Sequence, residues 1–544
     1  MRRHLLPLIL IALLHSVAFA QSSDEKVFQR QSLKRIQKTI GNLGGKGYVP
    51  VDVSVDSNGR KSTFSAKLVR PEKPLMFEAE FDLSDKQFEK LFQKNRAKKF
   101  RLIANEEYEL KKKNYHACIW HFDPTMTVLV EAETKKGADK PESQRLPIIW
   151  KPDSRIPSVG TQGGVFEAME KKTLDYMRAN QIPGLSMALV VKGRPVYEAA
   201  FGYADIDRKA KAKPSDVFRT AWFSRLITAT AVLQLVDQGK LKLDQPAFPL
   251  LNIKPWRESG ADPRLNKITV MQLLQETGGH DPELGMEPAF NPRTIQETMK
   301  LKSTPTPEQL IQYMISQPLA YEPGTKRVSS AYSFFVLARV IEKISGMSYE
   351  DYVLTNIKKP LGLNTLAMEE PDPDKRPEDS VRYYSRSGSF VTKLVGKDLG
   401  SWVKLSDAGF DFRLMDASHG WTASPGDLLT IGRAIQAEPS PLLSENAKKA
   451  LVSMPQYKRA QPKSNEQTNW HSMGGVEVRK RSSGMDFWNI SRGTYSTTSL
   501  YCFANGNARC FSINCTETIG GQNPVNAFLP IIKKGLGKAI EAMK

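Results

Sequence analysis

The sequence of 544 residues lacks several features that would each point to a particular class of protein. After residue 20 it has no apolar run approaching the roughly 20 residues that a membrane-spanning helix needs. It has no heptad repeat and no low-complexity tract, which excludes a long coiled coil and a largely disordered chain. Its basic residues are dispersed, with Lys111–Lys113 as the longest run, and no zinc-finger, stacking-sheet or helix-turn-helix signature is present. We therefore expect no nucleic-acid partner.

Histidine and cysteine are also scarce. The histidines beyond residue 20 are His116, His121, His280, His419 and His471, and none has a His-Glu-x-x-His or similar metal spacing, so we expect no metal and no other cofactor. The four cysteines are Cys118, Cys502, Cys510 and Cys515, which allow three full pairings. Cys502 and Cys510 flank the turn sequence ANGNA and are expected on adjacent strands. Disulfides and buried thiols both remain open.

The first twenty residues have the pattern of a secretory signal peptide. Arg2 and Arg3 precede the apolar run Leu5–Leu14, and Ala18-Phe19-Ala20 provides a small-x-small cleavage site. The pattern predicts a signal peptide over 1–20 and export to the periplasm or beyond. Removing the two arginines lowers the formal charge from +20 to +18. An exported chain with this charge can attract anionic envelope polymers or a membrane surface, or simply have a well-solvated basic surface.

Residues 21–123 contain two copies of a repeat, each predicted as an amphipathic helix followed by two strands. In the first copy the helix FQRQSLKRIQKTI leads to GYVPVDVSV and STFSAKLVR, and in the second KQFEKLFQKNRAKK leads to FRLIANEEYEL and NYHACIWHF. A helix over a small sheet would bury the alternating apolar faces, so we predict a compact α+β repeat domain. Residues 124–160 are predicted to hold a last strand and a proline-rich linker.

Residues 161–544 are predicted to form one large domain. A helix near 165–180 precedes two apolar strands that turn at Lys192-Gly193. The stretch 220–246 contains a helix that is apolar on most sides, which predicts that it lies at the domain centre. Strands return near the C-terminus before a final helix. The fold class is therefore α+β, with an antiparallel sheet assembled from both ends of the domain, flanking helices and a helical subdomain between them.

From about residue 165 onward the sequence resembles the β-lactamase-related serine hydrolases, which include class C β-lactamases, penicillin-binding-type esterases and D-amino-acid peptidases. The matching segments are IPGLSMALVVKGRPVYEAAFGYAD, ITATAVLQLVDQGKLKLDQP, ITVMQLLQETGG, EPGTKRVSSAYSFFVLARVIEKISGMSYEDYV, PLGLNTLAM and GWTASPGDLLTIGRAI. The N-terminal copies resemble bacterial tandem-repeat modules found ahead of such domains, and the two-part arrangement is similar to that of the polyglycine hydrolases. The resemblance implies a serine nucleophile within three motifs.

The first motif, Ser-x-x-Lys, places a lysine amine on the same helix face as the nucleophilic hydroxyl. Here the alignment puts Trp222 at the serine position and Arg225 at the lysine position. An indole offers only an N–H donor, and arginine stays protonated at physiological pH, so neither replaces the lost group. Ser224 is two residues on, roughly 200° around the helix, and should point away from the site.

The other two motifs are altered as well. The Tyr-x-Asn motif falls on Ser329, Ser330 and Ala331, so the phenol and the amide are both missing. The Lys-Thr-Gly or His-x-Gly motif falls at about Asn489-Ile490-Ser491, with neither a lysine nor a histidine. A serine, histidine and acid drawn from Ser329, His280 and Asp281 can be imagined, but nothing in the sequence brings them together.

These changes predict an exported β-lactamase-related protein that has lost acyl-serine chemistry and acts by binding an envelope polymer, a peptide or a protein. A ligand cleft would be lined by Trp222, Arg225, Ser329, Ser330 and Asn489, where an aromatic ring and an arginine can recognise a carboxylate or a sugar. The simpler interpretation is that Trp222 fills the vacated pocket. The alternatives are a serine hydrolase with a relocated nucleophile, acting on amide, ester or β-lactam bonds, and a pure scaffold.

Overall fold

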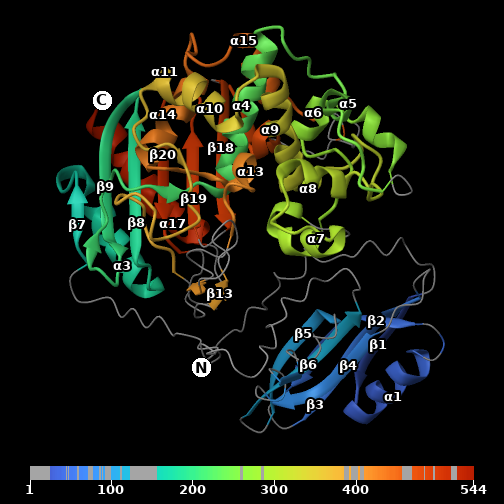
Figure 1. Cartoon of the computed structure of the whole chain (residues 1–544). Helices are drawn as coiled ribbons and strands as arrows, with labels where there is room; N and C mark the ends of the chain where they lie inside the picture. The colour runs from blue at the N-terminus through green and yellow to red at the C-terminus, as the bar shows by residue number, and fades with distance from the viewer. Residues whose placement is uncertain are drawn as a thin grey trace. The chain divides into compact units, whose positions relative to one another are not determined.

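The computed structural model describes most of the chain as two compact units, Met1–Lys140 and Pro141–Lys544 (Figure 1). The described residues are 25–44, 46, 48–57, 61–70, 77–84, 87, 90–91, 100–110, 113–122, 156–257, 261–282, 287–384, 391–393, 402–404, 410–455, 457, 469–482, 484–493, 496–515 and 524–543. The predicted signal peptide and most of the predicted linker therefore lie outside the described residues. Within those described, no helix combines the length and apolar character needed to cross a membrane.

The first unit contains the two predicted copies in mixed α+β form. Its first sheet has the order β1-β3-β2 and its second the order β4-β6-β5. The strands are β1 (Glu25–Gln31), β2 (Val49–Ser57), β3 (Ser62–Val69), β4 (Phe77–Ser84), β5 (Phe100–Leu110) and β6 (Lys113–Phe122), and α1 spans Leu33–Gly44. One core serves both copies, because Phe64 of the first packs edge-on against Phe81 and Tyr108 of the second.

The predicted repeat unit was incomplete, because each copy has a strand ahead of the helix. Residues 28–31, predicted as the start of a helix, belong to β1, which pairs antiparallel with β3. The backbone of Ser32 then accepts hydrogen bonds from Arg35 and Ile36, and α1 begins at Leu33. Pairing with β3, more than 30 residues away, satisfies the backbone of this segment, and a local sequence pattern does not reveal it. Of the second predicted helix, only residues 87, 90 and 91 are described.

The second unit is built on a nine-stranded sheet that both ends of the unit supply. Its order is β10-β9-β8-β20-β19-β18-β17-β16, with β7 added beside β9. The strands are β7 (Ser158–Gly160), β8 (Gly184–Val191), β9 (Arg194–Asp205), β10 (Ala210–Lys211), β16 (Asn469–His471), β17 (Glu477–Arg481), β18 (Gly484–Gly493), β19 (Ser496–Cys502) and β20 (Ala508–Ile513). Lys192 and Gly193 both have positive φ in the tight β8–β9 turn, as the sequence predicts.

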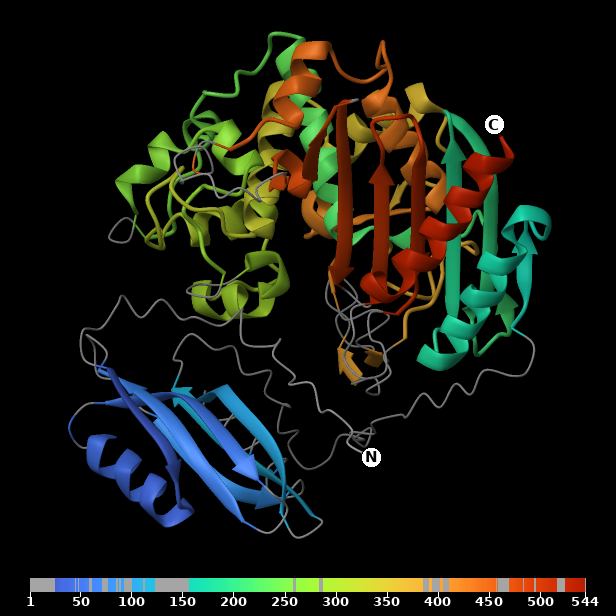
Figure 2. The same ribbon diagram turned by 180° about the vertical axis from the view of Figure 1, so that it is seen from behind.

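Helices cover both faces of this sheet (Figures 1 and 2). On one face α3 (Glu167–Asn180) and α17 (Pro524–Ala542) enclose a core with β8, β9 and β20. On the other, α4 (Ser224–Asp237) and α14 (Pro425–Gln436) join the larger core. The helical part adds α5 (Ala247–Leu251), α6 (Val270–Leu274), α7 (Pro292–Met299), α8 (Pro307–Met314), α9 (Ala331–Ser345), α10 (Tyr349–Val353), α11 (Lys359–Leu361), α13 (Asp416–His419) and α15 (Glu445–Leu451).

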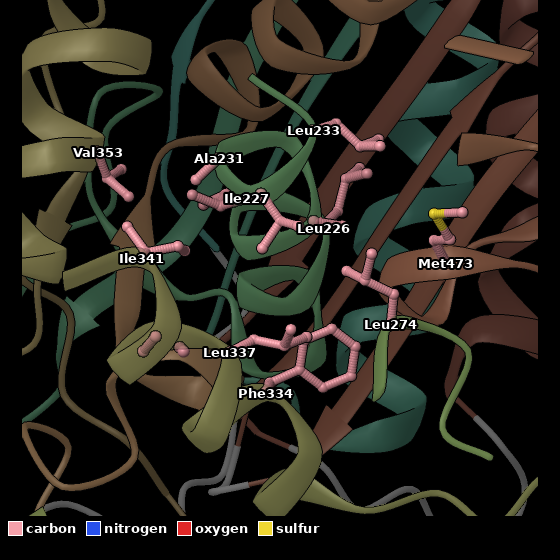
Figure 3. Close-up of a cluster of buried hydrophobic side chains, with 14 of the residues drawn as sticks. Leu226, Ile227, Ala231, Leu233, Leu274, Phe334, Leu337, Ile341, Val353 and Met473 are labelled. Atoms are coloured by element: carbon pink, nitrogen blue, oxygen red, sulfur yellow. The ribbon is translucent and has the colours of Figure 1, made fainter. Parts of the chain in front are cut away.

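Helix α4 lies at the centre of the larger core, as its apolar circumference predicts. Figure 3 shows Leu226, Ile227 and Leu233 from α4 among side chains of α9 and neighbouring segments. Twelve of its fourteen residues are buried. Because α4 is enclosed on every side, its N-terminal end is held in a fixed position against the sheet, and this end carries the altered catalytic motif.

The cysteines Cys502 and Cys510 lie on the adjacent strands β19 and β20, as predicted, but not opposite each other. Cys502 pairs with Ala508 and Cys510 with Leu500. Both are buried free thiols in the larger core, and burial raises the pKa of each above its usual value. Cys118 and Cys515 are buried as well.

Candidate functional site

The first altered motif sits at the start of α4. A short 3-10 turn, Ala221–Phe223, leads directly into the helix, and Ala221 adopts φ +43°, a left-handed conformation uncommon for a residue other than glycine. Trp222 is 38% exposed, so its ring does not fully plug an interior pocket. Ser224 faces the core, where its hydroxyl lies 3.0 Å from the Thr220 hydroxyl and accepts a hydrogen bond from the Trp421 amide. It therefore points away from Trp222, as the helix geometry predicts.

Arg225 occupies the lysine position as a buried cation, which forms its hydrogen bonds through one terminal nitrogen while its Nε atom has no hydrogen-bond partner. Its guanidinium lies 5.3 Å from the ring centres of both Trp222 and Phe334. It donates hydrogen bonds to the carboxylate of Glu276 and, at 2.9 Å, to the hydroxyl of Ser329. Burial lowers the pKa of Arg225 and the Glu276 carboxylate opposes this shift, but a guanidinium starts so high that it stays charged at neutral pH. The group at this position donates protons in hydrogen bonds and cannot accept one.

Glu276 is the residue that the sequence reasoning missed. Its side chain is 1% exposed and binds both Arg225 and Arg327. It also accepts hydrogen bonds from the Ser329 hydroxyl and the Ser330 amide, each at 3.2 Å. Burial raises the pKa of Glu276, but the two arginines together outweigh it, so the net pKa lies below its usual value. Glu276 is therefore an ionised counter-ion shared by two cations; we call this group of Arg225, Glu276, Arg327, Ser329 and Ser330 the Arg225 cluster.

The second motif lies next to the first, which supports the register used in aligning them. Ser329 contacts Arg225 across 104 residues of sequence, and α9 begins at Ala331. The carboxylate of Glu287 accepts hydrogen bonds from the amides of Ala331, at 2.6 Å, and Tyr332, at 3.0 Å. Glu287 thus binds the first two amides of α9, and Glu276 binds the amide of Ser330, the residue just before the helix.

The third motif lies on β18, which packs against the 3-10 turn that carries Trp222. Asn489 and Ser491 share the sheet face that includes Leu500 and Cys510. The Asn489 amide donates to the Gly475 carbonyl at 3.3 Å, while its Oδ1 atom and the Ser491 hydroxyl are buried without a hydrogen-bond partner. Gly475 lies beside both Asn489 and Arg225, so these polar groups face one region at the end of α4.

The structure does not assemble the other catalytic arrangements that the sequence allows. Both ring nitrogens of His280 are buried without a partner, and Asp281 accepts a hydrogen bond from Tyr321 instead. Ser329, His280 and Asp281 therefore form no triad. His116 is buried in the first unit, and the side chain of His121 lies outside the described residues. No cluster of potential metal ligands occurs in the described parts of the chain.

Ser329 is the hydroxyl best placed for a relocated nucleophile, and its surroundings are unsuited to that task. A serine needs an adjacent base that can take its proton. Its only acidic acceptor among the described residues is Glu276, and Arg327 and Arg225 hold the pKa of that carboxyl low. Arg225, the other neighbour, is itself a donor. The arrangement fixes Ser329 in place without activating it.

Comparisons with known proteins agree with this fold. The β-lactamase family model matches residues 168–517, and a model described as a polyglycine hydrolase-like structural repeat matches 29–66 and 76–123. The β-lactamase of Escherichia coli (strain K12) is 26% identical over 215 residues, which cover 39% of this chain and 50% of that protein. Protein flp of Staphylococcus aureus (strain N315) is 23% identical over 207 residues, 38% of this chain and 39% of its own length. The chain thus spans half or less of these curated relatives.

Solved structures show the same likeness at the level of the fold. The octameric penicillin-binding protein homologue from Pyrococcus abyssi has a TM-score of 0.51 at 20% identity, covering 68% of this chain and 77% of its own. The D-amino acid amidase from Ochrobactrum anthropi SV3 has a TM-score of 0.51 at 16% identity, covering 70% of this chain and 99% of its own. Since the family model spans more than half of the sequence, this chain belongs to the β-lactamase family and carries an N-terminal domain of polyglycine hydrolase-like repeats.

Proposed function

We propose that this chain is an exported member of the β-lactamase family that has lost acyl-serine chemistry and acts by binding a ligand or partner. The observation that carries the proposal is the ion pair between Arg225 and Glu276, which stands where the family's proton-accepting lysine would stand. A buried arginine with its own counter-ion cannot serve as a base. Trp222, at the nucleophile position, has no atom that can attack a carbonyl.

Partial exposure of Trp222 supports a binding role for this site. An indole ring that is 38% exposed, lying over the Arg225 guanidinium, offers a face for a sugar ring. Nearby, the Asn489 Oδ1 atom and the Ser491 hydroxyl have no hydrogen-bond partner. A ligand carrying a sugar and a carboxylate, such as a fragment of an envelope polymer, would match an aromatic face beside polar groups and a positively charged protein.

Covalent labelling tests the loss of chemistry. The purified protein is treated with a fluorophosphonate and with a β-lactam, and its intact mass is measured beside that of the Escherichia coli β-lactamase as a positive control. We expect the relative to gain the mass of each probe and this protein to gain none. An adduct on this protein would contradict the proposal, and peptide mapping would identify its nucleophile.

The Ser329→Ala variant addresses the relocated nucleophile, which the hydrogen bond between Ser329 and Glu276 makes the best-defined competing hypothesis. If labelling occurs and this variant abolishes it, Ser329 is the nucleophile. The double variant Trp222→Ser, Arg225→Lys restores only the first motif, so we expect it to remain unlabelled while Ser329 and Asn489 are unrepaired.

Calorimetric titration with muramyl dipeptide, which carries a sugar ring and a carboxylate, tests the binding role. We expect heat of binding with the natural protein and a loss of about fivefold in affinity in Trp222→Ala, since an aromatic stacking contact contributes about 1 kcal/mol. Trp256→Ala is the matched control, because Trp256 is also partly exposed and lies beside an arginine. The Cζ atom of Arg257 is 4.0 Å from the centre of the Trp256 ring. Equal losses in both variants would contradict a specific role for Trp222.

A further inference from the structure

The histidine at position 280 is held in a setting that suits only its neutral form. His280 is 9% exposed, and neither ring nitrogen has a hydrogen-bond partner. Its ring meets the ring of Tyr332 edge-on at 4.6 Å, and the Tyr332 hydroxyl is also buried without a partner. Phe248 lies on another side at 6.4 Å between ring centres. A charged imidazolium in this apolar setting would lack the partners that buried charges require.

His280 is the last residue of a short segment, residues 276–280. The backbone carbonyls of this segment accept hydrogen bonds from amides of a second segment, residues 320–328. The carbonyl of Glu276 accepts from the Val328 amide at 3.0 Å, and that of Thr277 from the Gly324 amide at 2.8 Å. The carbonyl of Gly279 accepts from the amides of Ala320, at 2.9 Å, and Tyr321, at 3.2 Å. A side chain added at Gly279 would meet the Tyr321 carbonyl oxygen at 2.5 Å, which shows how closely the two backbones approach.

The same two segments carry two of the three ions of the Arg225 cluster, since Arg225 itself lies on α4. Glu276 is the first residue of the 276–280 segment. Arg327, which forms an ion pair with Glu276, lies in the 320–328 segment. Glu276 also adopts φ +56°, a left-handed conformation that persists only where the surrounding contacts fix it. A change at His280 therefore reaches the Arg225 cluster through a few residues of backbone.

We propose that His280 makes residues 276–280 an acid-sensitive latch, which releases residues 320–328 and loosens the Arg225 cluster when the imidazole takes up a proton. In the closed latch, burial lowers the pKa of His280 to about 4, although Asp262 opposes the shift. In an opened latch the exposed ring would regain a pKa near 6.5. The contribution of His280 to the stability of the closed form is therefore fully present above pH 6.5. It is lost as the pH falls from 6.5 toward 4.

Three other ionisable groups of the second unit bear on this pH dependence, namely Asp262, Glu287 and His419. Asp262 is hydrogen-bonded to Arg264 and to the Leu319 amide, which hold its pKa low, so it stays ionised over this range. Burial raises the pKa of Glu287 to about 7, so its uptake of a proton favours the closed form as the pH falls and opposes the effect of His280. His419, on α13, is a second buried histidine with a lowered pKa, which hydrogen-bonds Ser418 and packs against Phe290.

Hydrogen exchange of the full chain, measured by mass spectrometry at pH 7.5 and pH 5.0 and corrected for the intrinsic pH dependence of exchange, tests the latch. The reporters are the amides of Ala320, Tyr321, Gly324 and Val328, whose acceptors lie in the 276–280 segment. The natural protein is compared with His280→Phe, which keeps an aromatic ring without a titrating group, with Glu287→Gln and with His419→Phe. His280→Gln serves as a second non-titrating variant should the phenylalanine variant fail to fold.

In Glu287→Gln we expect these amides to open about thirtyfold more often at pH 5.0 than at pH 7.5, from a His280 pKa of about 4 in the closed form and about 6.5 in the open form. In the natural protein the increase is smaller, because proton uptake by Glu287 favours the closed form. The increase should vanish in His280→Phe or His280→Gln, persist in His419→Phe and grow in Glu287→Gln. Unchanged opening between the two pH values in Glu287→Gln overturns the proposal. So does an increase that His419→Phe abolishes and the His280 variants retain.

Discussion

At the scale of single residues, the altered motifs act as one coupled change. Replacing lysine by arginine at position 225 places a permanent cation in a buried site, and such a cation needs a counter-ion. Glu276 supplies it, and the Ser329 hydroxyl accepts a hydrogen bond from Arg225 and donates one to Glu276. Because these three side chains bind one another, we expect a change at one of them to disturb the other two.

Glu276→Gln should strongly destabilise the second unit. The change leaves Arg225 and Arg327 without their shared counter-ion, and breaking a buried ion pair by removing one partner costs about 3–5 kcal/mol. Urea unfolding at pH 7 measures the loss. The matched control is Glu322→Gln, because the Glu322 side chain is 62% exposed in its pair with Arg264 and should cost about 1 kcal/mol or less. Equal costs for the two variants would show that the Arg225 cluster is solvated.

At the scale of elements, the central features of the fold could be predicted from the sequence. The apolar circumference of α4, the tight turn at Lys192-Gly193 and the strand return near the C-terminus all follow from local patterns that the structure confirms. The strand β1 was not predicted, because its partner β3 lies more than 30 residues away and residues 28–31 also fit a helical pattern. Patterns report local preferences, whereas strand pairing is a long-range property.

The candidate site shows the same division. The positions of Trp222, Arg225 and Ser329 followed from their spacing within recognisable segments. Glu276 did not, because its role depends on a left-handed backbone and on contacts with residues 51 and more positions away. A glutamate before two glycines in ETGG, in a segment expected to be buried, was the available signal. A buried arginine needs an acidic partner, and this rule would predict a glutamate such as Glu276 beside Arg225.

The 3-10 turn Met473–Gly475 packs directly onto α4 at the candidate site, so a substitution in this turn should disturb the site. Gly474 has φ +66°, and a side chain there would lie 3.0 Å from the Ala229 side chain, the Arg225 carbonyl oxygen and the Leu226 Cα. Gly474→Ala should therefore cost the backbone strain of a left-handed alanine, about 1–2 kcal/mol, plus overpacking of about 1–3 kcal/mol.

Gly346→Ala is the control for this variant. Gly346 ends α9 with φ +75°, and nothing lies within 4 Å of an added side chain, so only the backbone cost of about 1–2 kcal/mol is expected. Chemical unfolding of both variants separates strain from packing. A Gly474→Ala cost no larger than that of Gly346→Ala would mean that the turn moves away from α4 easily, and that the site is less rigid than its contacts indicate.

At the scale of the whole molecule, the chain divides into two compact units, and each unit has its own hydrophobic core. The first unit buries residues of both repeat copies together, whereas α4, α9 and the nine-stranded sheet form the core of the second. Each unit therefore has the means to unfold as a cooperative structure of its own.

Scanning calorimetry of the full chain should accordingly show two transitions that core variants shift one at a time. Phe64→Ala removes the ring that joins the two repeat copies at Phe81 and Tyr108, and should cost the first unit about 3–5 kcal/mol. Leu337→Ala, on α9 in the larger core, should cost the second unit about 2–5 kcal/mol. Each variant should lower one transition and leave the other in place. If both variants lower both transitions by similar amounts, the two units unfold cooperatively and the repeats stabilise the β-lactamase-like unit. A ligand bound at Trp222 would then also raise the unfolding temperature of the repeats.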